Sequence, residues 1–212
     1  MKVLLVDPPF HAFFEYDFWY YSHVCAHLAH YLKDRGHEAY VYEADKYFPK
    51  DLATRDRREM FRRRNWYSER VTDTDHYIWE HFRKVLLDMK PDVVAFHFMT
   101  PKLRSVDYML KICKEVDPTI KTAIGGPHFA GTTGGFENHP FLDGLFIGPG
   151  EKSLADWMAG GFKEKIVRTA ATDFEWTHAP VPDRSSLLFP DAYTSRDMGA
   201  IMASRGCSFN CT

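Results

Sequence analysis

Two cysteines near the end of the 212-residue chain have a spacing that suits metal binding. Cys207 and Cys211 are separated by three residues, and they follow an apolar run at residues 199–203 that predicts a strand. Thiolates at the end of a strand are typical ligands of an iron–sulfur cluster or of another metal. The spacing alone is equally compatible with two ordinary thiols. Because the sequence stops at Thr212, we expect further ligands in the continuation of a longer protein.

Two glycine-rich loops are a second group of candidate functional residues. Each follows an apolar run directly, and they are Gly125-Gly126-Pro127-His128 and Gly148-Pro149-Gly150-Glu151. Because glycine has no side chain, such loops let the backbone approach a ligand closely. They are not the dinucleotide fingerprint G-x-G-x-x-G, which is absent after the first strand. His128 could line the ligand site or be a hydrogen-bonded loop residue, and Glu151 could bind a polar group or complement a helix dipole.

Two proline-containing loops complete the set. Asp7-Pro8-Pro9 follows the apolar run at residues 3–6, and Thr100-Pro101 comes shortly after the run at residues 92–98. Proline disfavours continuation of the strand, so both segments are predicted to be loops that could contact a ligand. The hydroxyl of Thr100 could instead cap the helix that follows.

Alternating strands and helices must position these loops. Apolar runs predict strands at residues 3–6, 38–43, 92–98, 119–124 and 143–147, and amphipathic patterns predict helices at residues 20–35, 74–89, 102–116 and 151–158. This alternation predicts a doubly wound α/β domain with a mostly parallel, Rossmann-like (flavodoxin-like) sheet and helices on both faces. In a parallel sheet the four loops meet at one edge, where ligands of such sheets bind.

Other segments give weaker indications of function. An insertion at residues 44–90 is rich in arginine, but its interleaved acids favour a solvated helix with local ion pairs over a site for RNA or phosphate. His23, His27 and His30 share one helix face and could hold a metal, although a solvated row at the edge of the core is favoured. Residues 169–198 are rich in proline and polar residues, which predicts a connector between domains.

Composition excludes some classes of protein. The chain is 45% hydrophobic and 26% charged with a net charge of −2, which allows a packed core and gives no reason to expect nucleic acid as a partner. The four cysteines are too few for a disulfide scaffold, and no apolar run is long enough to cross a membrane. We therefore expect a soluble, cytoplasmic protein.

The order of these features resembles the cobalamin (B12)-binding radical SAM enzymes. The resemblance rests on the strand that ends in Asp7-Pro8-Pro9, on the two glycine loops, and on the segment Arg205-Gly206-Cys207-Ser208-Phe209-Asn210-Cys211. It implies a cobalamin-binding domain at residues 1–168, a connector at residues 169–198, and the truncated start of a radical SAM barrel at residues 199–212.

The resemblance also implies cofactors and a reaction. In that family the motif C-x-x-x-C-x-x-C binds a [4Fe–4S] cluster, so Cys207 and Cys211 match two ligands and position 214 would be the third. The cluster binds S-adenosylmethionine and receives electrons from a one-electron reductant of the flavodoxin or ferredoxin type. The reaction on a small-molecule substrate would be methyl transfer to carbon or radical ring formation. Residues 1–212 alone would be inactive.

For the first domain, the resemblance implies a cobalamin site built from the four loops. The residues expected to bind the cofactor are Pro9, Phe10, Thr100, Gly125, Gly126, Pro127, His128, Gly148, Gly150 and Glu151. Glycine backbones would lie beside the nucleotide tail, and Phe10 and Phe129 would cover the corrin ring. The chain lacks the motif D-x-H-x-x-G, so we expect no histidine on cobalt, with His11 as the less favoured alternative.

Two other classes of function stay open from the sequence. One is a stand-alone binding module for a corrinoid or another nucleotide-like ligand, in which the cysteines are incidental. The other is a flavodoxin-like regulatory domain.

Overall fold

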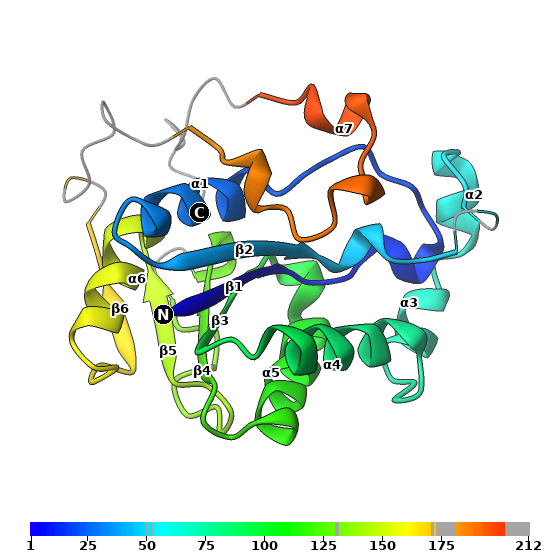
Figure 1. The fold of residues 1–212 in the computed structure, drawn as a ribbon. Helices are drawn as coiled ribbons and strands as arrows, with labels where there is room; N and C mark the ends of the chain where they lie inside the picture. The colour runs from blue at the N-terminus through cyan, green and yellow to red at the C-terminus, as the bar shows by residue number, and fades with distance from the viewer. Residues whose placement is uncertain (50, 52, 130–131, 171, 173–180, 202–212) are drawn as a thin grey trace.

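The computed structural model describes residues 1–49, 51, 53–129, 132–170, 172 and 181–201 (Figure 1). Its centre is one six-stranded sheet in the order β2-β1-β3-β4-β5-β6, in which every neighbouring pair is parallel. The strands are β1 (Lys2–Asp7), β2 (Glu38–Glu43), β3 (Val93–His97), β4 (Lys121–Gly125), β5 (Gly144–Ile147) and β6 (Ile166–Arg168). The predicted α/β fold class is confirmed. The short edge strand β6 was not predicted from the sequence.

Helices cover both faces of this sheet (Figure 1). The α-helices are α1 (His23–Lys33), α2 (Arg57–Arg62), α3 (Trp66–Arg70), α4 (Tyr77–Met89), α5 (Leu103–Val116), α6 (Gly150–Ala159) and α7 (Ser195–Met198). Helices α1 and α6 pack together on one face, and α4 and α5 pack together on the other. In the described residues, none of these helices is long and apolar enough to span a membrane.

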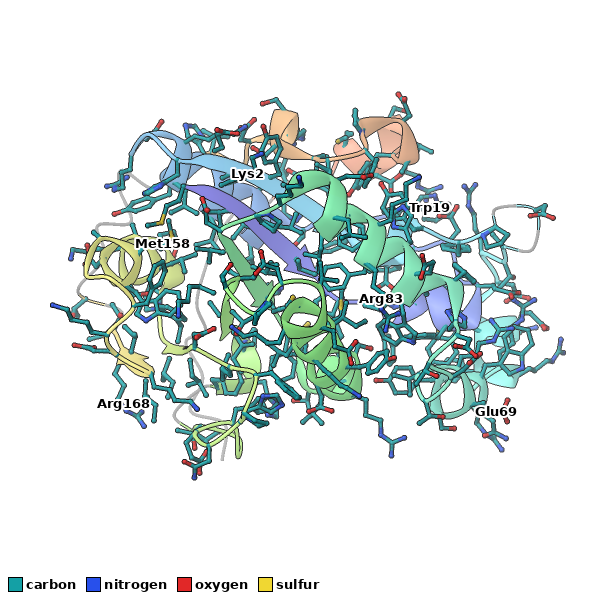
Figure 2. All side chains as sticks on the ribbon, turned by 60° about the horizontal axis from the view of Figure 1, so that its bottom comes forward. Lys2, Trp19, Glu69, Arg83, Met158 and Arg168 are labelled. Carbon is teal, nitrogen blue, oxygen red and sulfur yellow. The ribbon has the colours of Figure 1, made fainter. Side chains whose placement is uncertain are left out.

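The two faces of the sheet differ in the size of their side chains. Toward α4 and α5, the strands present large residues such as Phe96 and Ile124, and Figure 2 shows side chains packed between the sheet and these helices. Toward α1 and α6, β3 and β4 present Ala95 and Ala123. Successive strand residues point to opposite faces of the sheet. Phe96 and Ile124 therefore fill the face toward α4 and α5, while the alanines that precede them leave space on the face toward α1 and α6.

The arginine-rich insertion forms the short helices α2 and α3, and its arginines make both long-range and local ion pairs. Arg63 and Arg70 both bind the carboxylate of Glu15, at 3.3 and 3.0 Å, and both guanidinium groups lie over the ring of Trp66. Arg62 pairs with Glu59 at 3.0 Å. The two pairs with Glu15 attach the insertion to the loop after β1 and were not predicted, whereas the pair of Arg62 with Glu59 is of the predicted local kind.

The described part of the predicted connector packs against the domain. Leu187 forms a parallel bridge with Val41 of β2, and Lys33 of α1 pairs with Asp183 at 2.8 Å. Helix α7 follows, with a capping box between Thr194 and Asp197. The strand predicted from residue 199 is wrong in its described part, because residues 199–201 form no strand and Gly199 is the C-cap of α7. Its remainder lies outside the described residues.

A buried ion pair fastens this connector. The ammonium of Lys46 lies 2.5 Å from Asp197, and each side chain is only 3% exposed. Burial would raise the pKa of Asp197, but its hydrogen bonds to Lys46 and Thr194 lower it to about 2. In the unfolded chain an aspartate has a pKa of about 3.9. The lowered pKa therefore adds about 2 kcal/mol of stability above pH 4, and this is lost as pH falls through about 2.

We expect acid to release the connector before it unfolds the sheet. Hydrogen exchange read by mass spectrometry should show protection of residues 181–201 at pH 6 that decreases toward pH 2, while β3 and β4 stay protected. In an Asp197→Asn variant the connector should exchange faster already at pH 6. Equal protection of the connector in the variant and the unmodified protein at pH 6 would show that the ion pair does not hold it.

Candidate functional site

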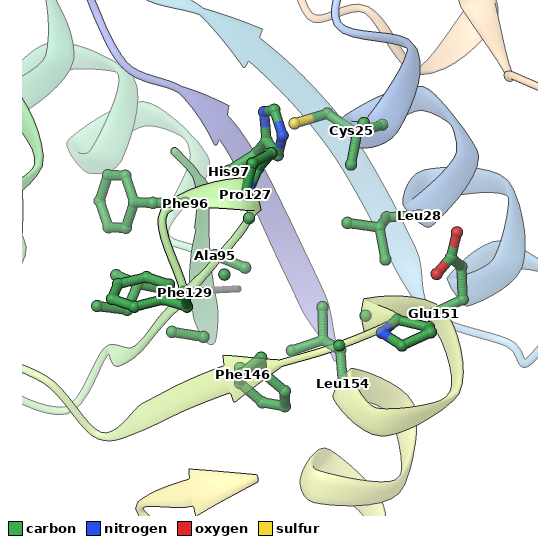
Figure 3. A pocket seen from close by; sticks show the side chains of 18 residues that line it. Cys25, Leu28, Ala95, Phe96, His97, Pro127, Phe129, Phe146, Glu151 and Leu154 are labelled. Carbon is green, nitrogen blue, oxygen red and sulfur yellow. The ribbon is translucent and has the colours of Figure 1, made fainter. Parts of the chain in front are cut away.

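A cavity of about 440 Å³ lies between α1, α6 and the carboxyl ends of β3, β4 and β5 (Figure 3). Helix α1 contributes Cys25 and Leu28 to its wall, and α6 contributes Leu154. Ala95 forms part of the side made by the sheet, and Phe146 of β5 lies opposite α1. The cavity is on the face of the sheet that carries small side chains, which is the physical reason that space exists there.

The glycine loops form one end of this cavity because their backbones take shapes that other residues resist. Gly126 has a φ of 132° and Gly148 a φ of 103°. A Cβ atom on Gly126 would lie 2.5 Å from the carbonyl oxygen of Phe98, and one on Gly148 would lie 1.9 Å from that of Thr169. Both positions therefore require glycine, and both turns bring main-chain atoms to the cavity wall.

The structure brings many of the predicted site residues together. Those that line the cavity are Gly125, Gly126, Pro127, Gly148, Gly150 and Glu151, together with Phe129. Pro9, Phe10, Thr100 and His128 do not line it. Their role in ligand binding stays a prediction, since they follow β1, β3 and β4 at the same carboxyl edge of the sheet.

These four residues are instead engaged with their neighbours. The hydroxyl of Thr100 and Nδ1 of His128 are 2.9 Å apart, so Thr100 bonds the loop histidine and does not cap a helix. The ring of Phe10 packs 5.2 Å from that of Tyr67. The carbonyl of Pro9 accepts a hydrogen bond of 2.7 Å from Ser105. These contacts hold the four residues outside the cavity lining.

Sequence reasoning missed the part of the site that comes from α1 and from the middle of the sheet. The predicted loops did not include Cys25, Leu28, Ala95 or Phe146, because a ligand wall formed by a helix depends on tertiary packing. The sequence does contain one indication, since β3 and β4 each include one alanine, Ala95 and Ala123, and these two residues are paired in the sheet. Small residues at matched positions of adjacent strands indicate space above the sheet.

The histidine row of α1 takes ordinary structural roles. His27 is buried, and the His30 ring lies 2.6 Å from the carbonyl of Val181 and 3.6 Å from Asp34. Within the part of the chain that the structure describes, no group of three or more histidine, cysteine or acidic side chains is arranged to hold a metal. Cys207 and Cys211 lie outside the described residues.

A buried charged cluster lies beside the cavity at the ends of β1 and β2. The ammonium of Lys102 contacts Asp7 and lies 3.6 Å from Asp45, and His11 lies 3.3 Å from Asp45. Burial works to raise the pKa of Asp45, but Lys102 and His11 hold it well below its usual range. Burial works to lower the pKa of Lys102, but Asp7 and Asp45 raise it. Asp45 and Lys102 are therefore both ionised at neutral pH.

Cys25 lies between this cluster and the cavity. Burial, and next the negative charge of Asp7, raise the pKa of its thiol. The side chain is fully buried and is a free thiol. A thiol with a raised pKa is neutral at physiological pH, so it adds no charge to the cavity wall.

Comparison with known proteins assigns this fold and cavity to a family. Residues 25–157, more than half of the chain, match the family model of the B12-binding domain. The chain belongs to the B12-binding domain family. The matched region of this B12-binding domain begins at Cys25 in α1 and ends in α6, so it contains the residues that line the cavity except Val24.

Three relatives of known name share parts of this sequence. An uncharacterised methyltransferase of Pyrococcus horikoshii is 27% identical over 147 residues, which cover 60% of this chain and 32% of the relative. The cytidylyl-2-hydroxyethylphosphonate methyltransferase of Streptomyces wedmorensis is 34% identical over 76 residues, and the anaerobic magnesium-protoporphyrin IX monomethyl ester cyclase of Rubrivivax gelatinosus is 31% identical over 81 residues. Each of these two alignments covers 35% of this chain and 14% of the relative. The matched region is thus a minor part of each relative.

The cavity fits one part of cobalamin in particular. The corrin ring with its amide arms is larger than a cavity of about 440 Å³, whereas an aromatic base with its ribose is of a size that such cavities hold. The walls are mainly apolar, as a planar base requires, and the turns at Gly126 and Gly148 bring main-chain atoms to the cavity end. The residues present therefore fit the nucleotide tail of the cofactor.

Proposed function

We propose that this chain forms the cobalamin-binding part of a radical SAM enzyme. The observation that carries the proposal is the B12-binding family match over residues 25–157, which contains an apolar cavity with glycine turns at one end. The spacing of Cys207 and Cys211 supports a [4Fe–4S] cluster and S-adenosylmethionine in the following domain. The names of the relatives, two methyltransferases and a cyclase, support methyl transfer to carbon or radical ring formation.

In this proposal the tail of cobalamin enters the cavity and the corrin ring lies across the carboxyl edge of the sheet. Leu28, Phe146 and Leu154 exclude water from the base, and the turns at Gly126 and Gly148 allow the sugar and phosphate to approach the backbone. Thr100 and Phe10, which follow β3 and β1 at the carboxyl edge of the sheet, would contact the edge of the corrin. When bound, cobalamin would supply a cobalt centre that carries a methyl group.

The proposal also includes a substrate, an electron donor and a cellular location for the whole protein. A small molecule is the substrate, and a one-electron reductant of the flavodoxin or ferredoxin type supplies electrons. A cytoplasmic location suits both an iron–sulfur cluster and the free thiols of Cys25 and Cys113.

The cysteine pair provides the test of the radical SAM assignment. After anaerobic reconstitution with iron and sulfide, the protein continued through position 214 should gain the broad visible absorbance of a [4Fe–4S] cluster. A Cys207→Ala, Cys211→Ala double variant should lose most of this absorbance and of its bound iron, because two of the three thiolates are gone. A Cys25→Ala, Cys113→Ala double variant is the matched control and should bind iron normally. If the first double variant retains the full cluster, the chain is a corrinoid-binding module whose cysteines are incidental.

A further inference from the structure

The inner wall of the cavity is made almost wholly of hydrocarbon. The side chains that face the space between α1 and the sheet include Val24, Leu28, Ala95, Ala123, Phe146 and Leu154. Among the described residues that line the cavity, the side chains with polar atoms are Cys25, His97 and Glu151. Figure 3 shows Cys25 and His97 together at one end and Glu151 on the side of α6, away from Ala95 and Phe146. A bound base would therefore meet mainly apolar atoms.

The polar side chains are poorly placed to satisfy a strongly polar base. Cys25 carries a neutral thiol, which is a weak hydrogen-bond donor. His97 lies beside Cys25 at one end of the cavity, and Glu151, which is 1% exposed, lies in the first turn of α6, away from Ala95 and Phe146. Polar atoms that enter such a cavity lose their bonds to water, and an unsatisfied buried polar group is destabilising.

Corrinoids differ in the base of their nucleotide tail, and the difference is chemical. A dimethylbenzimidazole joined to its ribose has one remaining ring nitrogen, while the rest of its edge is carbon and methyl groups. An adenine in the same position has three remaining ring nitrogens and an amino group. Transfer from water into an apolar cavity thus removes hydrogen bonds from more atoms of the purine than of the benzimidazole.

We infer that this cavity selects corrinoids with a benzimidazole base over corrinoids with a purine base. The inference rests on the proposed binding of the cobalamin tail in the cavity. The selecting residues are those of the inner wall, above all Leu28 of α1 and Phe146 of β5. They favour a base with an apolar edge and offer few partners to a base with a polar one.

Three corrinoids separate this inference from the proposed function. Absorbance titrations of the whole chain would use hydroxocobalamin, its adenine-containing counterpart, and cobinamide, which lacks the nucleotide tail. We expect hydroxocobalamin to bind at least about tenfold more tightly than either of the other two. Equal affinity for the benzimidazole and adenine forms would overturn the inference and leave the proposed function intact. If cobinamide bound as tightly as hydroxocobalamin, the inference would also be overturned, because the nucleotide tail would then contribute nothing through the cavity. Failure to bind any of the three would overturn the proposed function.

A matched pair of variants tests whether the inner wall of the cavity is the part that selects the base. Leu28→Gln introduces an amide into the inner wall with a side chain one bond longer, and glutamine is also a good helix former. We expect this variant to bind hydroxocobalamin more weakly and the adenine form more tightly, so that the ratio of the two affinities falls several-fold. Leu87→Gln is the same change on α4 at a side chain that is 58% exposed, and it should leave the ratio unchanged. An unchanged ratio in a folded Leu28→Gln protein would show that the inner wall does not select the base.

Discussion

Replacement of Ala95 by leucine should abolish cobalamin binding and leave the domain folded. Ala95 lies in the middle of β3, is 8% exposed, and lines the cavity between the sheet and α1. A leucine there would project into the space that the base needs, so the affinity for hydroxocobalamin should fall at least about 100-fold, or about 2.7 kcal/mol. Because the added atoms enter existing space, the fold should not be overpacked, and the midpoint of thermal unfolding should stay equal or rise.

The control for this substitution is Ala159→Leu, the same change at an exposed position at the end of α6. It should bind hydroxocobalamin like the unmodified protein in the same absorbance titration. Unchanged affinity in a folded Ala95→Leu protein would mean that the ligand does not use the cavity at all. Loss of folding, seen by circular dichroism, would mean that the space above β3 is smaller than the structure indicates.

Replacement of Lys102 by methionine should strongly destabilise the domain. Lys102 is the cation between Asp7 and Asp45, and its side chain is 12% exposed. Burial and the nearby charge of Asp7 also raise the pKa of Glu43 well above its usual range, so this region already resists further negative charge. Removal of the cation leaves the buried carboxylate of Asp7 without its ion-pair partner and the carboxylate of Asp45 with His11 as its only ion-pair partner among the described residues, which costs about 3–5 kcal/mol for a pair of this kind. Urea unfolding at pH 7 measures the loss.

The pH dependence of this loss follows from the pKa of Asp45. Lys102 and His11 lower the pKa of Asp45 in the folded protein. The stability that these contacts provide is therefore fully present above the unfolded pKa of about 3.9, and it is lost as the pH falls below that value. Without the ammonium, the carboxylates take up protons at higher pH, and the difference between variant and unmodified protein should shrink as pH falls toward 4. The control Lys111→Met removes a half-exposed lysine that pairs with Glu115, and it should cost no more than about 1 kcal/mol. Equal losses for the two variants would show that burial of the cluster is not important.

The fold could be predicted from the sequence because its main determinants are local. Apolar runs identified five of the six strands, and the observed bounds differ from the predicted ones by at most two residues. Strand β6 was missed because Ile166 and Arg168 are exposed and a three-residue edge strand has no apolar run. The strand predicted at residue 199 failed in its described part because Thr194 and Asp197 form a helix cap just before it, a contact that the apolar pattern does not reveal.

The candidate site was predictable to the extent that its residues are in loops. Gly126 and Gly148 could be identified because their backbone requirements appear in the sequence as glycine after a strand. The contribution of α1 could not be identified, because Cys25 and Leu28 reach the cavity only through the packing of that helix over Ala95 and Ala123. An apolar helix residue that lines a ligand cavity and one that fills the core look the same in sequence.

The most direct test of cobalamin binding is an absorbance titration of the whole folded chain with hydroxocobalamin, followed by gel filtration. We expect one corrinoid to be retained per chain, with the spectrum of a corrinoid whose base has left the cobalt because that base lies in the cavity. The Ala95→Leu protein should retain none. A folded, unmodified chain that retains no corrinoid, with the cobalt oxidised or reduced, would contradict the account.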